Sequence, residues 1–163
     1  MVSVSRSTLV VPPHEIDIAN RLKASALFHF IQGAAAAHAE ALQLEYESLR
    51  AAGLFWVLSW VRLEVETYPQ LRDSISIETW PQSRYKLFSL RDFLFIDNQQ
   101  HIFARARTAW LLVYAAAKRI TSLDRLPRPV PYQEDRRAMD TFPQKIPPAE
   151  RAETIYEKRI GYT

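Results

Sequence analysis

The residue types that serve hydrolysis and metal binding are scattered along this chain. The four histidines show no metal-ligand spacing, and His29 and His38 are nine residues apart, which turns them to opposite sides of a helix. The chain has no cysteine, no G-x-S-x-G motif and no glycine-rich phosphate loop. We therefore expect no metal, no cofactor, no disulfide and no thiolate nucleophile.

Two single residues remain as candidates. Asp17, just before a predicted helix, could serve as a catalytic carboxylate, and the alternative is that it caps a turn. His38 falls at the centre of an apolar helical face, where a polar ring needs a hydrogen-bond partner. It is either a satisfied core histidine or a substrate contact.

A slot for an alkyl chain needs small side chains beside aromatic walls. The alanine run from Ala34 to Ala37 supplies the small side chains, and Trp56, Trp60, Trp80 and Trp110 could supply the walls. Burial in the core or in an interface is the alternative for each of them.

The element that must position these residues is one amphipathic, alanine-rich helix over about residues 25–42. Long strand-like runs follow it, over residues 55–67, 74–80 and 87–97 and from Ile102 to Val113, with no second helix between them. Without crossover helices the sheet must be antiparallel. The pattern predicts an α+β hotdog fold, in which a curved antiparallel sheet wraps a long central helix. Within the helix we expect Gly33 to allow a close approach to the sheet.

The strand over residues 55–67 predicts an interface as well as a core. Its odd positions form one apolar face that should pack on the helix, and its even positions begin with Trp56, Leu58 and Trp60 before turning charged. A half-apolar outer face usually meets another protein surface. We expect a second copy or a second domain to cover it.

Two further features interrupt the sheet pattern. Residues 97–100 read as the hairpin turn into the last strand. Arg91 and Asp92 break the alternation of the preceding strand with two adjacent charges, so they predict a bulge, an inward polar pair or a functional site.

Composition limits the class of protein. A chain of 163 residues with 48% hydrophobic residues builds one core and an appendage, and its net charge of +3 does not require nucleic acid as a partner. It has no apolar run of membrane-spanning length, and residues 1–8 lack the apolar core of a signal peptide. We expect a cytoplasmic protein.

Proline divides the chain. Six of the ten prolines lie between Pro127 and Pro148, and proline is excluded from helix interiors and central strands. We expect a hotdog domain over residues 1–126, a linker over 127–149, and a further strand within 150–163.

A set of residues spread along the chain has the order and spacing of a known family. The set is Gln32 and His38, Trp56 and Val57, Tyr68 and Pro69 ahead of Asp73, Ile77 to Trp80, Arg91 and Asp92, Asp97, Trp110, and Lys118 and Arg119. Over about residues 11–126 the chain thereby resembles the acyl-acyl-carrier-protein thioesterases of plants and bacteria. That family tends to carry Glu and Asn at the positions of Gly33 and Ala37.

The resemblance implies the first of two hotdog domains in a hydrolase that releases fatty acid from acyl carrier protein. Residues 156–163 resemble the opening strand of the second hotdog, so the catalytic residues are expected after Thr163. The basic residues that we expect to steer the acidic carrier protein are Arg84, Lys86, Lys118 and Arg119, for which plain solvated charges are the alternative.

Two alternatives stay open. The chain could be a complete acyl-CoA thioesterase that works as a homodimer, with Asp17 as its carboxylate. It could also be a non-catalytic module that binds acyl groups.

Overall fold

One antiparallel sheet and one long helix dominate the computed structural model, which describes residues 3–144. In chain order the elements are β1 (Ser5–Val10), the 3-10 turn η1 (Pro13–Glu15), α1 (Ala24–Ala41), α2 (Tyr46–Ala51), β2 (Leu54–Val65), β3 (Ser74–Tyr85), β4 (Phe88–Ile96), β5 (Ile102–Tyr114), β6 (Arg119–Thr121) and η2 (Leu123–Arg125). The strand order is β1-β3-β4-β5-β2, with the short β6 on β5. Every strand pair is antiparallel, as predicted.

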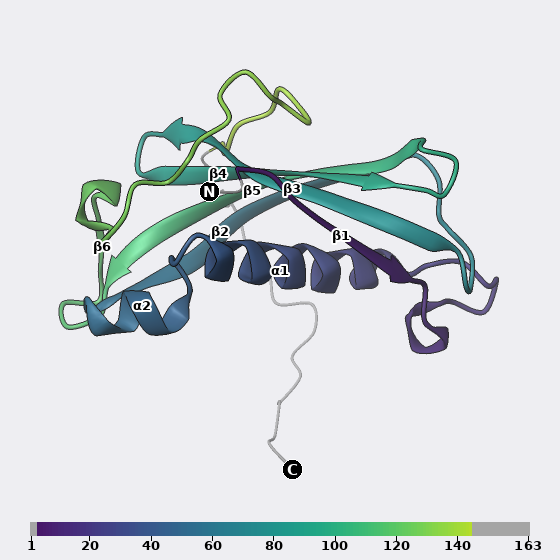
Figure 1. The fold of residues 1–163 in the computed structure, drawn as a ribbon, viewed down its shortest axis with the longest axis horizontal. Helices are drawn as coiled ribbons and strands as arrows, with labels where there is room; N and C mark the ends of the chain where they lie inside the picture. Colours follow the sequence, from purple (N-terminus) through teal and green to yellow (C-terminus); the bar gives the residue numbers. More distant parts are fainter. Residues whose placement is uncertain (1–2, 145–163) are drawn as a thin grey trace, which may run out of the picture.

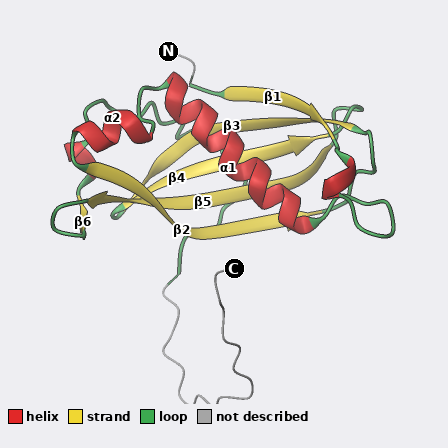
Figure 2. Cartoon of the chain, turned by 90° about the horizontal axis from the view of Figure 1, so that it is seen from below, coloured by secondary structure: helices red, strands yellow, loops and turns green. Residues whose placement is uncertain are grey.

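Helix α1 runs across one face of the curved sheet (Figures 1 and 2). Its buried face, including Leu27, Ile31 and Ala35, packs against Ile77 of β3 and Phe93 of β4 in the main core. A second cluster around Leu44, Leu49 and Leu112 joins α2 to the end of the sheet. The structure is therefore the expected hotdog fold.

Helix α2 and strand β1 are among the elements that were not predicted. Helix α2 interrupts the expected direct passage from the long helix to the sheet, and its six residues bury only Leu49. A helix of this length shows too few turns for its periodicity to be visible. Strand β1 is mostly exposed, so its sequence lacks the apolar alternation of a half-buried strand.

The predicted faces of β2 are wrong in its first half. The pairing register with β5 shifts between Leu58 and Trp60, so Ser59 is an extra residue, a β-bulge. Beyond the bulge Val61 packs on the main core as predicted, whereas before it the even position Trp56 packs on the helix side. One inserted residue moves all preceding side chains to the opposite face.

The predicted role of Gly33 is also wrong, because a Cβ atom built on Gly33 meets nothing within 4 Å. The glycine therefore costs helix stability with no close contact to offset it. We expect Gly33→Ala to raise the free energy of unfolding by about 0.5–1 kcal/mol, as measured by urea denaturation. An unchanged or lower value would contradict this assignment.

The outer face of the sheet, opposite α1, is crossed by a segment without helix or strand (Figure 1). We call residues 133–142 the strap. It begins where the Gln133 N–H donates to the Pro81 carbonyl (2.9 Å), and Trp80 Nε1 then donates to the carbonyl of Arg136 (2.9 Å). The described part of the predicted linker is thus packed against the sheet, while residues 145–163, including the predicted further strand, lie outside the described part of the structure.

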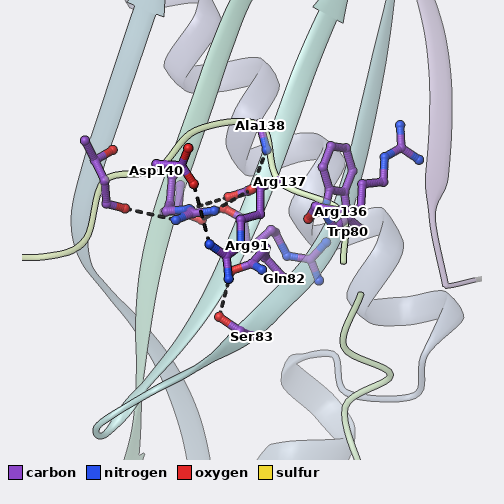
Figure 3. A network of polar contacts seen from close by, with 12 residues as sticks. Trp80, Gln82, Ser83, Arg91, Arg136, Arg137, Ala138 and Asp140 are labelled. Carbon is purple, nitrogen blue, oxygen red and sulfur yellow. Dashed lines mark hydrogen bonds and ion pairs between the residues drawn. The ribbon is translucent and has the colours of Figure 1, made fainter. Parts of the chain in front are cut away.

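The strap closes over a buried ion pair. Asp92 and Arg107 are both fully buried, and the Arg107 guanidinium donates to the two Asp92 carboxylate oxygens at 2.6 and 2.7 Å. Asp92 also accepts from the Ala138 N–H, and Arg107 donates to the Thr141 carbonyl. Figure 3 shows this network between the strap and the strands. Of the alternatives for Arg91 and Asp92, a bulge is present, but on the partner strand β3, where the extra residue Gln82 lies between the partners of Arg91 and Leu90. Asp92 is a buried polar residue, as the second alternative expected, and its partner is Arg107.

Candidate functional site

A cavity of about 610 Å³ lies between the second half of α1, α2 and the sheet. This volume falls in the range of small-molecule sites, about 300–1,000 Å³. Its lining residues come from α1 (Gln32, Ala35, Ala36, Ala37, Ala39, Glu40), from the turn and α2 (Leu42, Leu44, Glu45, Tyr46, Glu47, Leu49), from the sheet (Trp56, Pro81, Ser89, Arg91, Trp110) and from Val130.

Most of the cavity wall is apolar. Ala35, Ala36 and Ala37 of the alanine run line the cavity together with Trp56 and Trp110. Both indoles are held in place through their N–H groups: Trp56 Nε1 donates to the Leu44 carbonyl at 3.3 Å, and Trp110 Nε1 donates to Thr108 Oγ1 at 2.8 Å. An apolar wall of this kind suits an alkyl chain, because removing the methylenes of the chain from water stabilises the bound state.

One charged side chain, Arg91 of β4, also lines the wall. Its Nη1 lies 3.0 Å from Nδ1 of the buried His38 and 3.2 Å from Thr79 Oγ1. Burial lowers the pKa of Arg91 to about 10, since a low-dielectric surrounding disfavours the charged form. Arg91 and Asp92 are successive strand residues, so they face opposite sides of the sheet. That alternation places one charge in the cavity and the other under the strap.

The rim contributed by α1 and α2 is acidic, with Glu40, Glu45 and Glu47. The Ser48 hydroxyl donates to Glu45, and this hydrogen bond lowers the pKa of the Glu45 carboxyl. The lowered pKa keeps the Glu45 carboxyl ionised at neutral pH.

The predicted substrate-binding residues divide into three groups. Trp56 and Trp110 line the cavity. His38 lies behind the wall, in contact with the cavity residue Arg91. Ala34 packs on the main core instead, and Trp60 faces the other side of the sheet, where it lines a second hollow with Phe142. Arg91 was not predicted as a cavity residue.

Asp17 lies in a surface turn and does not line the cavity. Its Oδ1 accepts from the N–H groups of Ala19 (2.8 Å) and Arg21 (3.0 Å), and these bonds, the one from Arg21 first, lower the pKa of its carboxyl. This geometry is that of a turn-capping residue.

The four predicted carrier-binding residues lie at the hairpin ends of the sheet, outside the cavity lining. Arg84, near the end of β3, forms an ion pair with Asp124 at 2.8 Å, and this bond raises the pKa of Arg84. Lys86 lies 5.2 Å from the centre of the Tyr85 ring. Lys118 and Arg119 are exposed and form no ion pair within residues 3–144.

Within residues 3–144 no group of three or more His, Cys, Asp or Glu side chains could hold a metal ion. No helix in that range is long and apolar enough to cross a membrane.

A long helix wrapped by a curled antiparallel sheet, with an apolar cavity at the end of the helix, defines a hotdog domain. The chain belongs to the acyl-ACP thioesterase family, because the family model described as Acyl-ACP thioesterase N-terminal domain matches residues 3–125.

Individual relatives are distant. The chain is 27% identical over 127 residues to the chloroplastic acyl-[acyl-carrier-protein] hydrolase FATB1 of Cuphea viscosissima. The aligned region covers 74% of this chain and 30% of that protein. The chain spans about a third of the length of the curated relatives that it matches.

Solved structures support the fold. An acyl-ACP thioesterase from Bacteroides thetaiotaomicron superposes with a TM-score of 0.70 at 23% identity, over 86% of this chain and 60% of that one. A DHNA-CoA thioesterase from Staphylococcus aureus superposes with a TM-score of 0.67 at 12% identity, over 75% of this chain and 82% of that one.

Proposed function

We propose that this chain is the amino-terminal hotdog of a fatty acyl-ACP thioesterase and that its cavity holds the acyl chain during hydrolysis of the thioester. The observation that carries the proposal is the apolar cavity of about 610 Å³ in a domain of this family. Such a cavity binds acyl groups mainly through buried methylenes, each worth about 0.8 kcal/mol.

We further propose that the hydrolytic residues lie in a second hotdog domain, because the matched relatives are about three times as long as the matched region. Hydrolysis needs a carboxylate or imidazole to activate water, and backbone N–H groups to stabilise the oxyanion. This half would then supply binding energy rather than chemistry.

The acyl carrier protein would approach the end of the sheet that carries Arg84, Lys86, Lys118 and Arg119. Complementary charge steers an acidic partner and raises its association rate. Lys118 and Arg119 are the stronger candidates, since Arg84 already pairs with Asp124. The location of the protein in the cytoplasm stays a prediction, because the curated relatives are named as chloroplastic.

The structural match to a DHNA-CoA thioesterase over 82% of that chain favours one second candidate. A single hotdog can make up most of a thioesterase subunit, so this chain could act alone on acyl-CoA as a homodimer. We therefore propose to assay the 163-residue protein, and a version extended by a second hotdog domain, on acyl-ACP and acyl-CoA. Turnover by the extended protein alone supports the first candidate, and acyl-CoA turnover by the 163-residue dimer supports the second.

Asp17→Asn tests the second candidate at its proposed carboxylate. Because both Asp17 oxygens serve the surface turn, we expect no change in hydrolysis of acyl-CoA by whichever version is active, and a small loss of thermal stability. A fall in kcat of a hundredfold or more, with an unchanged melting temperature, would place Asp17 in the catalytic machinery.

A further inference from the structure

Arg91 is a guanidinium without an anion. Among the described residues its side chain makes hydrogen bonds to His38 and Thr79, and within residues 3–144 it forms no ion pair with a carboxylate. Both contacts use the same nitrogen, Nη1, so neither Nε nor Nη2 has a partner among the described residues. Enclosed guanidinium groups are normally paired with a carboxylate, because an unpaired charge is costly away from bulk water.

Arg107, one strand away, shows how this chain holds a guanidinium that serves the fold. It is fully buried and donates two hydrogen bonds to Asp92 and a third to the Thr141 carbonyl. The Asp92 carboxylate therefore neutralises its charge. The two arginines differ in surroundings as well. Arg107 is fully buried under the strap, whereas Arg91 is half-buried and lines the cavity. Arg91 is therefore placed to meet a ligand.

Apart from Gln32 and the residues of the rim, the sheet side of the cavity has one more polar side chain near Arg91. Ser89, two residues earlier on the same face of β4, also lines the cavity, and its hydroxyl accepts from the Tyr132 hydroxyl at 3.1 Å. The rest of the sheet-side wall is formed by Trp56, Trp110 and Pro81. A matching ligand has one anionic end and a long apolar remainder.

We propose that the cavity binds an alkyl chain that carries a carboxylate, with the carboxylate paired to Arg91. A planar guanidinium matches a carboxylate in charge and geometry. A phosphate fits less well, because a single guanidinium would leave part of its charge unpaired and the rim already carries Glu40, Glu45 and Glu47.

This inference rests on the proposed acyl-binding role of the cavity. It adds that the cavity also recognises a negatively charged group on the ligand. The carboxylate can come from two sources: the free fatty acid that hydrolysis releases, or an acyl thioester whose far end is carboxylated. In the first case the product would compete with substrate for the cavity.

The test compares decanoate with 1-decanol, which has the same carbon count and no charge, in binding to the 163-residue protein. Trp56 and Trp110 line the cavity, so tryptophan fluorescence gives the signal. We expect decanoate to bind about 10- to 150-fold more tightly than decanol. Equal binding overturns the carboxylate proposal and leaves the acyl-binding role intact, whereas no binding of either overturns both.

Arg91→Met tests the residue. We expect it to abolish the preference for decanoate while the melting temperature stays level or rises, because the variant removes an unpaired enclosed charge. Arg128→Met is the matched control, since Arg128 is exposed and does not line the cavity. An unchanged decanoate preference in Arg91→Met overturns the proposal. If Arg91→Met does not fold, the wild-type comparison of decanoate with decanol decides.

The two sources are separated with pantetheine thioesters. Tight binding of ω-carboxynonanoyl-pantetheine, but not of decanoyl-pantetheine, identifies a carboxylated acyl chain as the ligand. Tight binding of decanoate alone identifies the free acid. Equally tight binding of decanoyl-pantetheine overturns the proposal, because that ligand has no carboxylate.

Discussion

Replacing Asp92 by alanine is expected to lower the free energy of unfolding by about 3–5 kcal/mol. The reason is that Arg107 is fully buried and draws two of its three hydrogen bonds from Asp92. Alanine would leave a buried guanidinium without its counter-charge. For a domain of this size the loss corresponds to a fall of roughly 6–20 °C in melting temperature, to be measured by circular dichroism.

A matched control separates burial from the mere loss of an ion pair. Glu66 pairs with Arg105 on the exposed part of the same sheet face, and Glu66→Ala should cost less than about 1 kcal/mol. The double variant with Asp92→Leu and Arg107→Met should recover much of the stability lost in Asp92→Ala, since no unpaired charge remains. Equal losses for Asp92→Ala and Glu66→Ala would contradict the assignment.

The same variant reports on the strap. Ala138 donates its N–H to Asp92, and the Thr141 carbonyl accepts from Arg107, so the pair anchors the strap at two points. We expect Asp92→Ala to expose the strap to trypsin at Arg136 and Arg137 under conditions in which the wild-type protein is resistant. Cleavage at equal rates in the two proteins would show that other contacts hold the strap.

The architecture could be predicted from the sequence because two strong periodicities, one long helix and several two-residue alternations, leave few arrangements. The faces of β2 could not, since the Ser59 bulge changes the face without changing the composition. The strap was read as a linker for a similar reason. It lies between Pro131 and Pro143 in a proline-rich stretch that predicts no regular structure, yet its backbone groups bind the sheet individually, a pattern with no period.

The site was predictable only in part. Trp56 and Trp110 were expected near an alkyl slot, and they line the cavity, although their role in binding substrate stays a prediction. Trp60 was grouped with them because it is a tryptophan, and the sheet places it on the opposite face. The signal for Arg91 was present as a charge within an apolar strand. Alternation alone shows that Arg91 and Asp92 diverge, whereas only the structure shows which of them finds a partner.

Filling the cavity is expected to have the largest effect on ligand binding. Ala39 lines the cavity wall on α1, and phenylalanine at this position would place an aromatic ring where the alkyl chain lies. In the wild-type protein each added methylene should raise the affinity for alkanoates about fourfold until the cavity is full. If the ring displaces about four methylenes, the loss for long chains is about 3 kcal/mol, or roughly 200-fold.

The distinguishing result is a change in the chain-length profile, rather than a uniform loss. Short alkanoates still fit beside the ring and keep their contact with Arg91, so their affinity should change little, whereas the gain per methylene should stop several carbons earlier. Ala41→Phe is the control, since Ala41 is an exposed residue of the same helix outside the cavity lining. A profile that stays unchanged in a folded Ala39→Phe protein would mean that the alkyl chain binds elsewhere, because a ring inside an occupied cavity must displace part of its ligand.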